Sequence, residues 1–231
     1  MALLKDNTTP RPGSEMRAYS RAERTSDLVL HVAALGIALG AVPVLIAVTL
    51  LWRRDAASVF GVSIYGLTLI AMLTASLLYN HAGRPHMKAL FRRIDMSAIH
   101  LKIAGTYTPF ALLTGAGSGL LAAVWSAALG AMAITLFRRN VSSGLAVLMC
   151  LCTGWAIIFG GWDILGALPR SVVALMLIGG VLYSVGTPFL LAWRLKFHNT
   201  IWHGFVVVAS VVLYVAVLLC VAAPQVAPSI N

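Results

Sequence analysis

The sequence predicts an all-α membrane protein: a bundle of seven transmembrane helices, with the N-terminus in the cytoplasm and the C-terminus outside. Of the 231 residues, 60% are hydrophobic and only 10% are charged, against about half and about a quarter in soluble domains. Seven apolar stretches are each close to the roughly 20 residues that a helix needs to cross a bilayer. The connections between them alternate in positive charge, as the loops of a multi-pass membrane protein do.

The apolar stretches follow one another with short connections. Neighbouring helices are therefore expected to be antiparallel and to pack as one domain over residues 27–223. The third stretch is the weakest, because His100 and Lys102 lie inside it. Residues 1–26 are polar and are expected to form a flexible cytoplasmic tail, and residues 224–231 a short external tail. The expected spans are residues 27–52, 56–79, 96–114, 118–137, 141–160, 171–193 and 200–223.

The distribution of lysine and arginine predicts the orientation. One side of the membrane would carry only Arg53, Arg54 and Arg170. Because basic residues near span ends favour the cytoplasm, the other side is assigned there. The formal net charge of +10 then indicates contact with anionic lipid of a cell (plasma or inner) membrane, and no nucleic-acid-binding module accompanies it. The thirteen basic residues assigned to the cytoplasmic side are Lys5, Arg11, Arg17, Arg21, Arg24, Arg84, Lys88, Arg92, Arg93, Arg138, Arg139, Arg194 and Lys196.

Glycines and cysteines mark particular points within the spans. Gly36 and Gly40 form a G-x-x-x-G pattern, which predicts close approach of another helix, as does the glycine-rich face of residues 179–186. Cys150 and Cys152 lie in the fifth span with no metal-ligating partner nearby in sequence. Buried thiols of this kind are normally small apolar packing residues.

Polar side chains gather where four spans would meet the cytoplasmic side. Ionisable residues within a membrane are costly, so they are candidates for function. Ser76 and Asn80 share one helical face, as do Asn199 and His203. His81 lies about 140° around its helix from Ser76, and His198 about 140° from His203, so both are expected to point to the loops or headgroups. The polar-rim residues are Asp27 and His31 in the first span, Ser76, Asn80 and His81 in the second, Asp95 in the third, and His198, Asn199 and His203 in the seventh.

Each candidate also has a purely structural interpretation. Asp95 could cap the third span at its N-terminus, and Lys102 could extend to the headgroups. His203 could be a hydrogen-bonded core histidine, His31 a helix-contact residue, and Ser76 a residue that bonds its own helix.

Several motifs together resemble the hemolysin III family, which is related to the adiponectin and progestin receptors and, more distantly, to alkaline ceramidases. The similarity covers the whole membrane region and implies seven spans with an inside N-terminus. The motifs are SLLY at 76–79, LFRRID at 90–95, AGTYTPF at 104–110, GGVLY at 179–183 and NTIWH at 199–203.

The resemblance implies a zinc site at the cytoplasmic rim, with three histidine ligands and with a serine and an aspartate beside bound water. The serine falls on Ser76, the aspartate on Asp95 and one histidine on His203. The other two ligand positions hold Asn80 and Asn199, whose amide oxygens are weaker zinc ligands than imidazole. The candidate metal ligands are therefore His203 and Asp95, and with two amides they would make an oxygen-rich site that binds metal more weakly. Alternatively, Lys102 could supply the positive charge to Asp95 in place of a metal.

Three functions follow from the resemblance. The first is a metal-dependent hydrolase of lipid amides or esters, in which Asp95 is the general base and Ser76 positions the water or the substrate. The second is a non-enzymatic sensor, receptor-like or membrane-homeostasis protein with a lipid-like ligand. The third is cytolysis. No span shows a polar stripe along its whole length, as a pore would need.

Overall fold

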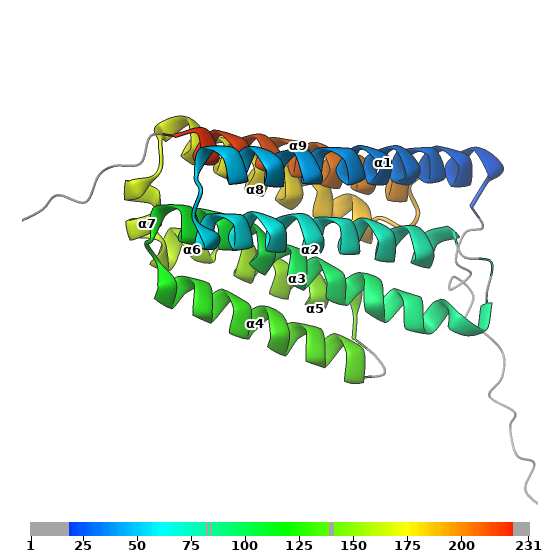
Figure 1. Ribbon diagram of the computed structural model, residues 1–231. Coiled ribbons are helices and arrows are strands. Elements are labelled where there is room, and N and C mark those ends of the chain that lie inside the picture. The colour runs from blue at the N-terminus through cyan, green and yellow to red at the C-terminus, as the bar shows by residue number, and fades with distance from the viewer. Residues whose placement is uncertain (1–18, 82, 84, 139–140, 224–231) are drawn as a thin grey trace, which may run out of the picture.

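In the computed structural model, residues 19–81, 83, 85–138 and 141–223 are described, and among them there is no β-strand. The tail residues 1–18 and 224–231, with Arg84 and Arg139, lie outside the described residues. Figure 1 shows the long helices running side by side in one bundle. The helices are α1 (Arg21–Trp52), α2 (Ala56–His81), α3 (Lys88–Thr114), α4 (Ser118–Phe137), α5 (Ser143–Gly154), α6 (Ala156–Gly160), α7 (Trp162–Ala167), α8 (Arg170–Leu191) and α9 (His198–Ala222), with a 3₁₀ turn, η1 (Pro85–Met87).

The long helices follow the expected spans, with differences at three places: α3 begins at Lys88 rather than at residue 96, and the other two concern α1 and the fifth span. α1 begins at Arg21 rather than at Asp27, because Ser20 and Glu23 form a capping box that starts the helix early. The fifth span is broken at Trp155 into α5 and α6.

Among the described residues, six helical segments are long and apolar enough to cross a membrane. The third expected span, within α3, is not among them, because polar residues that include His100 and Lys102 lower its hydropathy. The seven-span count and the orientation therefore stay predictions. α3 nevertheless lies between α2 and α4 (Figure 1).

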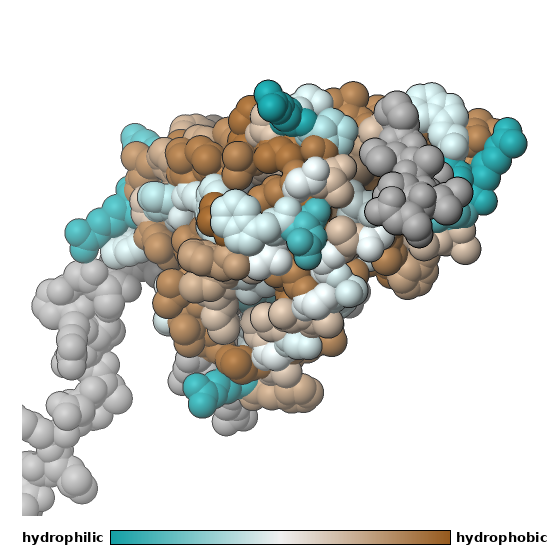
Figure 2. All heavy atoms as spheres, turned by 90° about the vertical axis from the view of Figure 1, so that its left-hand side faces the viewer, coloured by the Kyte–Doolittle hydropathy of each residue, from teal (hydrophilic) through white to brown (hydrophobic). Residues whose placement is uncertain are grey.

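Apolar side chains cover the outside of the bundle, as lipid contact requires. Ile37, Leu67 and Phe159 are 63%, 64% and 83% exposed. Figure 2 views the bundle from the end that carries the α1–α2 connection, and hydrophilic residues appear there only in separate places.

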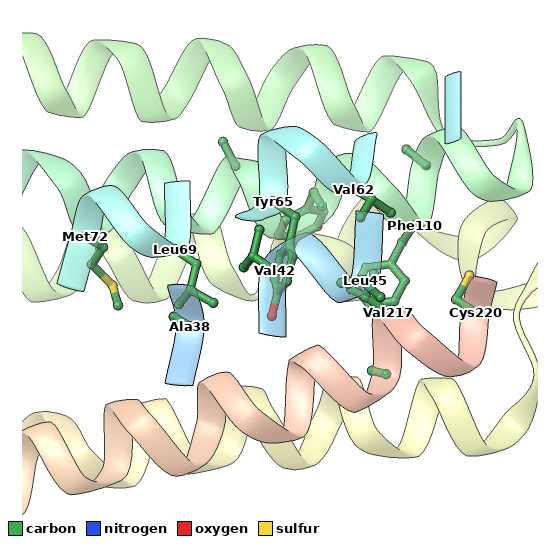
Figure 3. Close-up of a cluster of buried hydrophobic side chains, with 14 of the residues drawn as sticks. Ala38, Val42, Leu45, Val62, Tyr65, Leu69, Met72, Phe110, Val217 and Cys220 are labelled. Atoms are coloured by element: carbon green, nitrogen blue, oxygen red, sulfur yellow. The ribbon is translucent and has the colours of Figure 1, made fainter. Parts of the chain in front are cut away.

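The core lies where α1, α2, α3 and α9 meet. Figure 3 shows Val42 and Leu45 of α1 beside Tyr65 of α2, with Phe110 of α3 and Val217 of α9 close by. These helices converge because small residues let them approach. At Gly105 on α3, an added Cβ would lie 2.9 Å from Cβ of Thr68 on α2. The same helices carry the polar rim beyond this core.

Gly36 and Gly40 do not mediate the close helix approach that their spacing predicted. An added Cβ at either would meet nothing within 4 Å among the described residues. The prediction holds for α8, because a Cβ on Gly179 would lie 2.8 Å from Leu213 of α9, and one on Gly186 would lie 2.8 Å from Phe205.

Candidate functional site at the polar end of the bundle

α1 brings Asp27 and His31 to the polar end of the bundle. They lie one helical turn apart and are 4% and 3% exposed. The Nδ1 atom of His31 is 2.8 Å from the backbone oxygen of Asp27. A carbonyl oxygen only accepts hydrogen bonds, so Nδ1 must be the donor, and in the neutral ring Nε2 is left as an acceptor.

α9 places His203 against the same aspartate. Nδ1 of His203 lies 2.6 Å from Oδ1 of Asp27. The carboxylate accepts this hydrogen bond, so Nδ1 of His203 is also a donor. Nε2 of His203 turns away from Asp27 and lies 3.3 Å from Oγ of Ser76. The aspartate thereby fixes the ring orientation of His203.

The Ser76 hydroxyl on α2 lies between two imidazoles. Its Oγ is 3.1 Å from Nε2 of His31 and 3.3 Å from Nε2 of His203. The two rings pack edge to face, with centroids 4.2 Å apart. Ser76 has a single proton to donate, so the two histidines and the Asp95 carboxylate, which also interacts with Ser76, compete for it. The Ser76 hydroxyl therefore contacts side chains of α1 and α9, as well as Asn80 of its own helix.

The side chains of Asn80 and Asn199 are hydrogen-bonded to each other. Nδ2 of Asn199 donates to Oδ1 of Asn80 at 3.0 Å. The Asn80 amide nitrogen in turn donates to the backbone oxygen of Ser76 at 2.9 Å and lies 3.4 Å from its Oγ. Asn80 thus presents its nitrogen, rather than its oxygen, towards Ser76.

His81 and His198 face protein groups, contrary to the sequence-based expectation. Nε2 of His81 lies 3.1 Å from Oδ2 of Asp27. Nδ1 of His198 lies 3.1 Å from the backbone oxygen of Phe189, and its Nε2 is 2.8 Å from the Tyr19 hydroxyl. The helical spacing was right, but other parts of the protein pack against those sides: α1 beside His81, and α8 and Tyr19 beside His198.

Asp95 on α3 is half-buried and interacts with Ser76 and with His203. The carboxylate that contacts His203 at hydrogen-bond distance is Asp27, which was named with the polar rim but not chosen as a site residue. The spacing of Asp27 and His31, four residues apart on one helical face, was the available signal.

Lys102 does not reach Asp95. Its Nζ donates to Oγ1 of Thr106 at 2.6 Å and lies 5.0 Å from the ring centre of Tyr65. The side chain thus extends towards the following turn of α3. Lys102 is also about 10.5 Å of helix rise from Asp95. The expectation that it supplies charge at the rim is therefore wrong.

Asp27, His31 and His203 form a buried group that could hold a metal ion. One donor atom from each lies within 4.8 Å of the other two. Two imidazole nitrogens and a carboxylate oxygen are a donor set that suits zinc. We name these three residues with Ser76, Asn80 and Asn199 the rim site.

Comparison with known proteins assigns the chain to a family. The family model described as "Haemolysin-III related" matches residues 19–214. The chain belongs to the hemolysin III family. The Bacillus subtilis (strain 168) protein "Hemolysin-3 homolog" is 36% identical over 166 residues, which cover 70% of this chain and 78% of that protein. The Bacillus cereus protein "Hemolysin-3" is 36% identical over 168 residues, covering 71% and 76%.

The three-histidine ligand set implied by the resemblance to the hemolysin III family does not fit this chain. Of its three positions only His203 is a histidine, and Asn80 and Asn199 bond to each other. A different buried set, which Asp27 and His31 complete with His203, could hold a metal ion. Every residue of the rim site lies inside the family match.

Proposed function

We propose that this chain is a membrane-embedded hydrolase that cleaves ester or amide bonds of membrane lipids at the rim site. The observation that supports it is the Ser76 hydroxyl, set between two imidazoles with the Asp27 carboxylate behind one of them. Hydroxyl, imidazole and carboxylate groups are those that acyl transfer and hydrolysis use. Their location at one end of apolar helices favours a lipid or lipid-like substrate.

The proposal includes seven spans, with the rim site on the cytoplasmic side of a plasma or inner membrane. α3 runs alongside α2 and α4 (Figure 1), so it would cross the membrane with them. Among the described residues, the helix ends near the rim site carry many more basic residues than the opposite helix ends. This charge difference favours a cytoplasmic location for the rim site. The substrate would then come from the inner leaflet.

Zinc is the ion that the buried donor set suits. Asp27, His31 and His203 would hold it, and zinc supplies activation of water and polarisation of a carbonyl when bound. The remaining rim residues would position the substrate: Asn80 faces Ser76, and Asp95 interacts with it.

The test is lipid turnover by the purified full-length protein in lipid nanodiscs. Isotope-labelled phospholipids and ceramides are added in turn, and released fatty acid is measured by mass spectrometry. We expect release from at least one lipid class, and loss of release in Ser76→Ala and in His203→Ala. Ser63→Ala is the matched control on α2, because its hydroxyl donates within its own helix, to the Val59 backbone oxygen. No release from any lipid, with and without added zinc, would contradict the proposal.

Cytolysis is a second candidate, supported by the names of the two Bacillus relatives, "Hemolysin-3" and "Hemolysin-3 homolog". It predicts that the protein releases a trapped dye from liposomes at low protein-to-lipid ratio. Intact liposomes under conditions in which lipid is cleaved would separate the two functions. Lipid binding with neither turnover nor leakage would favour a non-enzymatic, receptor-like protein.

A further inference from the structure

Three residues of the rim site are connected in the order that nucleophilic acyl transfer needs. Oγ of Ser76 lies 3.3 Å from Nε2 of His203, and Nδ1 of the same ring lies 2.6 Å from Oδ1 of Asp27. Hydroxyl, imidazole and carboxylate in this order let the ring take the hydroxyl proton while the carboxylate holds the ring in the correct tautomer. The arrangement is recognised by geometry, whatever the fold that carries it.

The carboxylate in this arrangement is held from both sides. Oδ1 of Asp27 accepts from His203, while Oδ2 lies 3.1 Å from Nε2 of His81. Asp27, Ser76 and His203 are 4%, 8% and 7% exposed. A buried group that is held by two hydrogen bonds keeps one orientation. Such preorganisation is what makes polar groups effective in catalysis.

The two asparagines at the family's ligand positions supply a further part. Nδ2 of Asn80 lies 3.4 Å from Oγ of Ser76, and Asn199 bonds the amide oxygen of Asn80. This bond turns the Asn80 amide nitrogen towards Ser76. A side-chain amide so placed can donate to the oxyanion that forms when a serine attacks a carbonyl, and such a donor is worth about 10²–10³ in kcat.

We propose that Ser76 is a nucleophile, with His203 as its general base, Asp27 as the residue that orients His203, and Asn80 as the oxyanion donor. The inference rests on the proposed function for its substrate class, a lipid ester or amide. It assigns to this chain a covalent route that needs no metal.

The steps balance as follows. Oγ of Ser76 bonds to the carbonyl carbon while its proton moves to Nε2 of His203, and Asn80 donates to the resulting oxyanion. The bond to the alcohol or amine then breaks, and His203 returns the proton to that leaving group. Water attacks the acyl-serine and gives a proton to His203. When the ester to Ser76 breaks, that proton restores the hydroxyl and the fatty acid leaves.

This route keeps the lipid hydrolase of the proposed function but replaces its zinc-activated water, because zinc binding and the serine route exclude each other. The proposed zinc ligands include His203 and Asp27, and their lone pairs cannot serve an ion and the relay together. Added zinc is therefore expected to inhibit, whereas a zinc hydrolase would be activated by it.

The test is covalent labelling by an alkyl fluorophosphonate, using the full-length protein in nanodiscs and metal-free buffer. Oγ of the reactive serine bonds to phosphorus and fluoride leaves. We expect a single adduct, located at Ser76 by peptide mass spectrometry. Asp27→Asn keeps the shape of the side chain and is expected to slow labelling at least about 100-fold. Ser63→Ala is expected to label at the wild-type rate, and zinc to slow labelling of the wild type.

Each possible outcome supports or overturns the inference. No adduct on the wild-type protein, or an adduct only at another serine, overturns the inference without depending on any variant. Labelling of the Asp27→Asn variant at the wild-type rate also overturns the inference. Lipid cleavage that survives fluorophosphonate and stops with a zinc chelator would retain the proposed function and remove the inference. An adduct at Ser76 without cleavage of any lipid would retain the nucleophile and remove the proposed substrate class.

Discussion

Nδ1 of His203 on α9 lies 2.6 Å from Oδ1 of Asp27 on α1, although the two residues are 176 positions apart in the chain. The contact joins the first and last helices of the bundle at the point where Ser76 of α2 faces both His203 and His31. The rim site therefore depends on the closed bundle, and a helix that shifts at either end of the chain would disassemble it.

Asp27 is predicted to be more important than Asp95 for both stability and activity. Two histidine nitrogens lie at hydrogen-bond distance from its side-chain carboxylate, and leaving buried donors unpaired costs about 1–3 kcal/mol each. Asp27→Ala should lower the melting temperature and abolish lipid release. Asp95→Ala, at a half-buried position, should lower both less. A fluorescence-detected melting curve and the fatty-acid assay measure the two effects. The opposite ranking would restore Asp95 as the general base.

Gly105 is predicted to be intolerant of alanine. The added Cβ would lie 2.9 Å from Cβ of Thr68 and closer still to its hydroxyl, and overpacking of this kind costs about 1–3 kcal/mol. Gly105→Ala should therefore lower the melting temperature. Gly36→Ala is the matched control, because its Cβ meets nothing within 4 Å. Equal effects at the two positions would show that α2 and α3 do not pack as described.

Lys102 is predicted to be dispensable for catalysis. Its ammonium contacts Thr106 and Tyr65, away from the rim site. Lys102→Met keeps the length of the chain and removes a buried charge, so we expect unchanged lipid release and equal or higher stability. A loss of more than about tenfold in kcat, equivalent to about 1.4 kcal/mol, would contradict this placement.

Asp55 caps α2, and its contribution to stability should depend on pH. Its Oδ1 accepts from the Ser58 amide at 2.8 Å. Partial burial raises the pKa of Asp55, but hydrogen bonds from Ser58 and the charge of Arg53 outweigh it and hold the pKa below 3.8. The stabilisation is therefore present above 3.8 and lost as the pH falls through the lower folded value.

Asp55→Ala should accordingly destabilise by about 1 kcal/mol near neutral pH and by less in acid. Melting curves across this range test it, with Asp163→Ala, at an exposed position, as control. A loss that does not shrink at low pH would contradict the role of the carboxylate as a cap.

Hydropathy and the short connections predicted much of the fold, because lipid contact requires long apolar helices and short connections allow few arrangements. They also predicted that polar residues of α1, α2, α3 and α9 meet at one end. The spacing could not predict which atoms pair. The hydrogen bond between Asp27 and His203 joins helices from opposite ends of the chain. His81 reaches Asp27 because α1 packs against the side of α2 that carries His81.

Cys150 shows the same limit. It has no ligating partner nearby in sequence, yet its Sγ lies 3.5 Å from Nδ1 of His100 on α3. Contacts of this kind follow from how α3 and α5 pack, which the pattern of either helix alone does not determine.

The most direct test of the central claim, that Ser76 and His203 act as one unit in lipid cleavage, is a double-mutant cycle on fatty-acid release. Residues that act together in one step give strongly non-additive losses. We predict that Ser76→Ala combined with His203→Ala loses no more activity than the more damaging single substitution. Losses that multiply, or singles that leave release at the wild-type rate, would contradict the account.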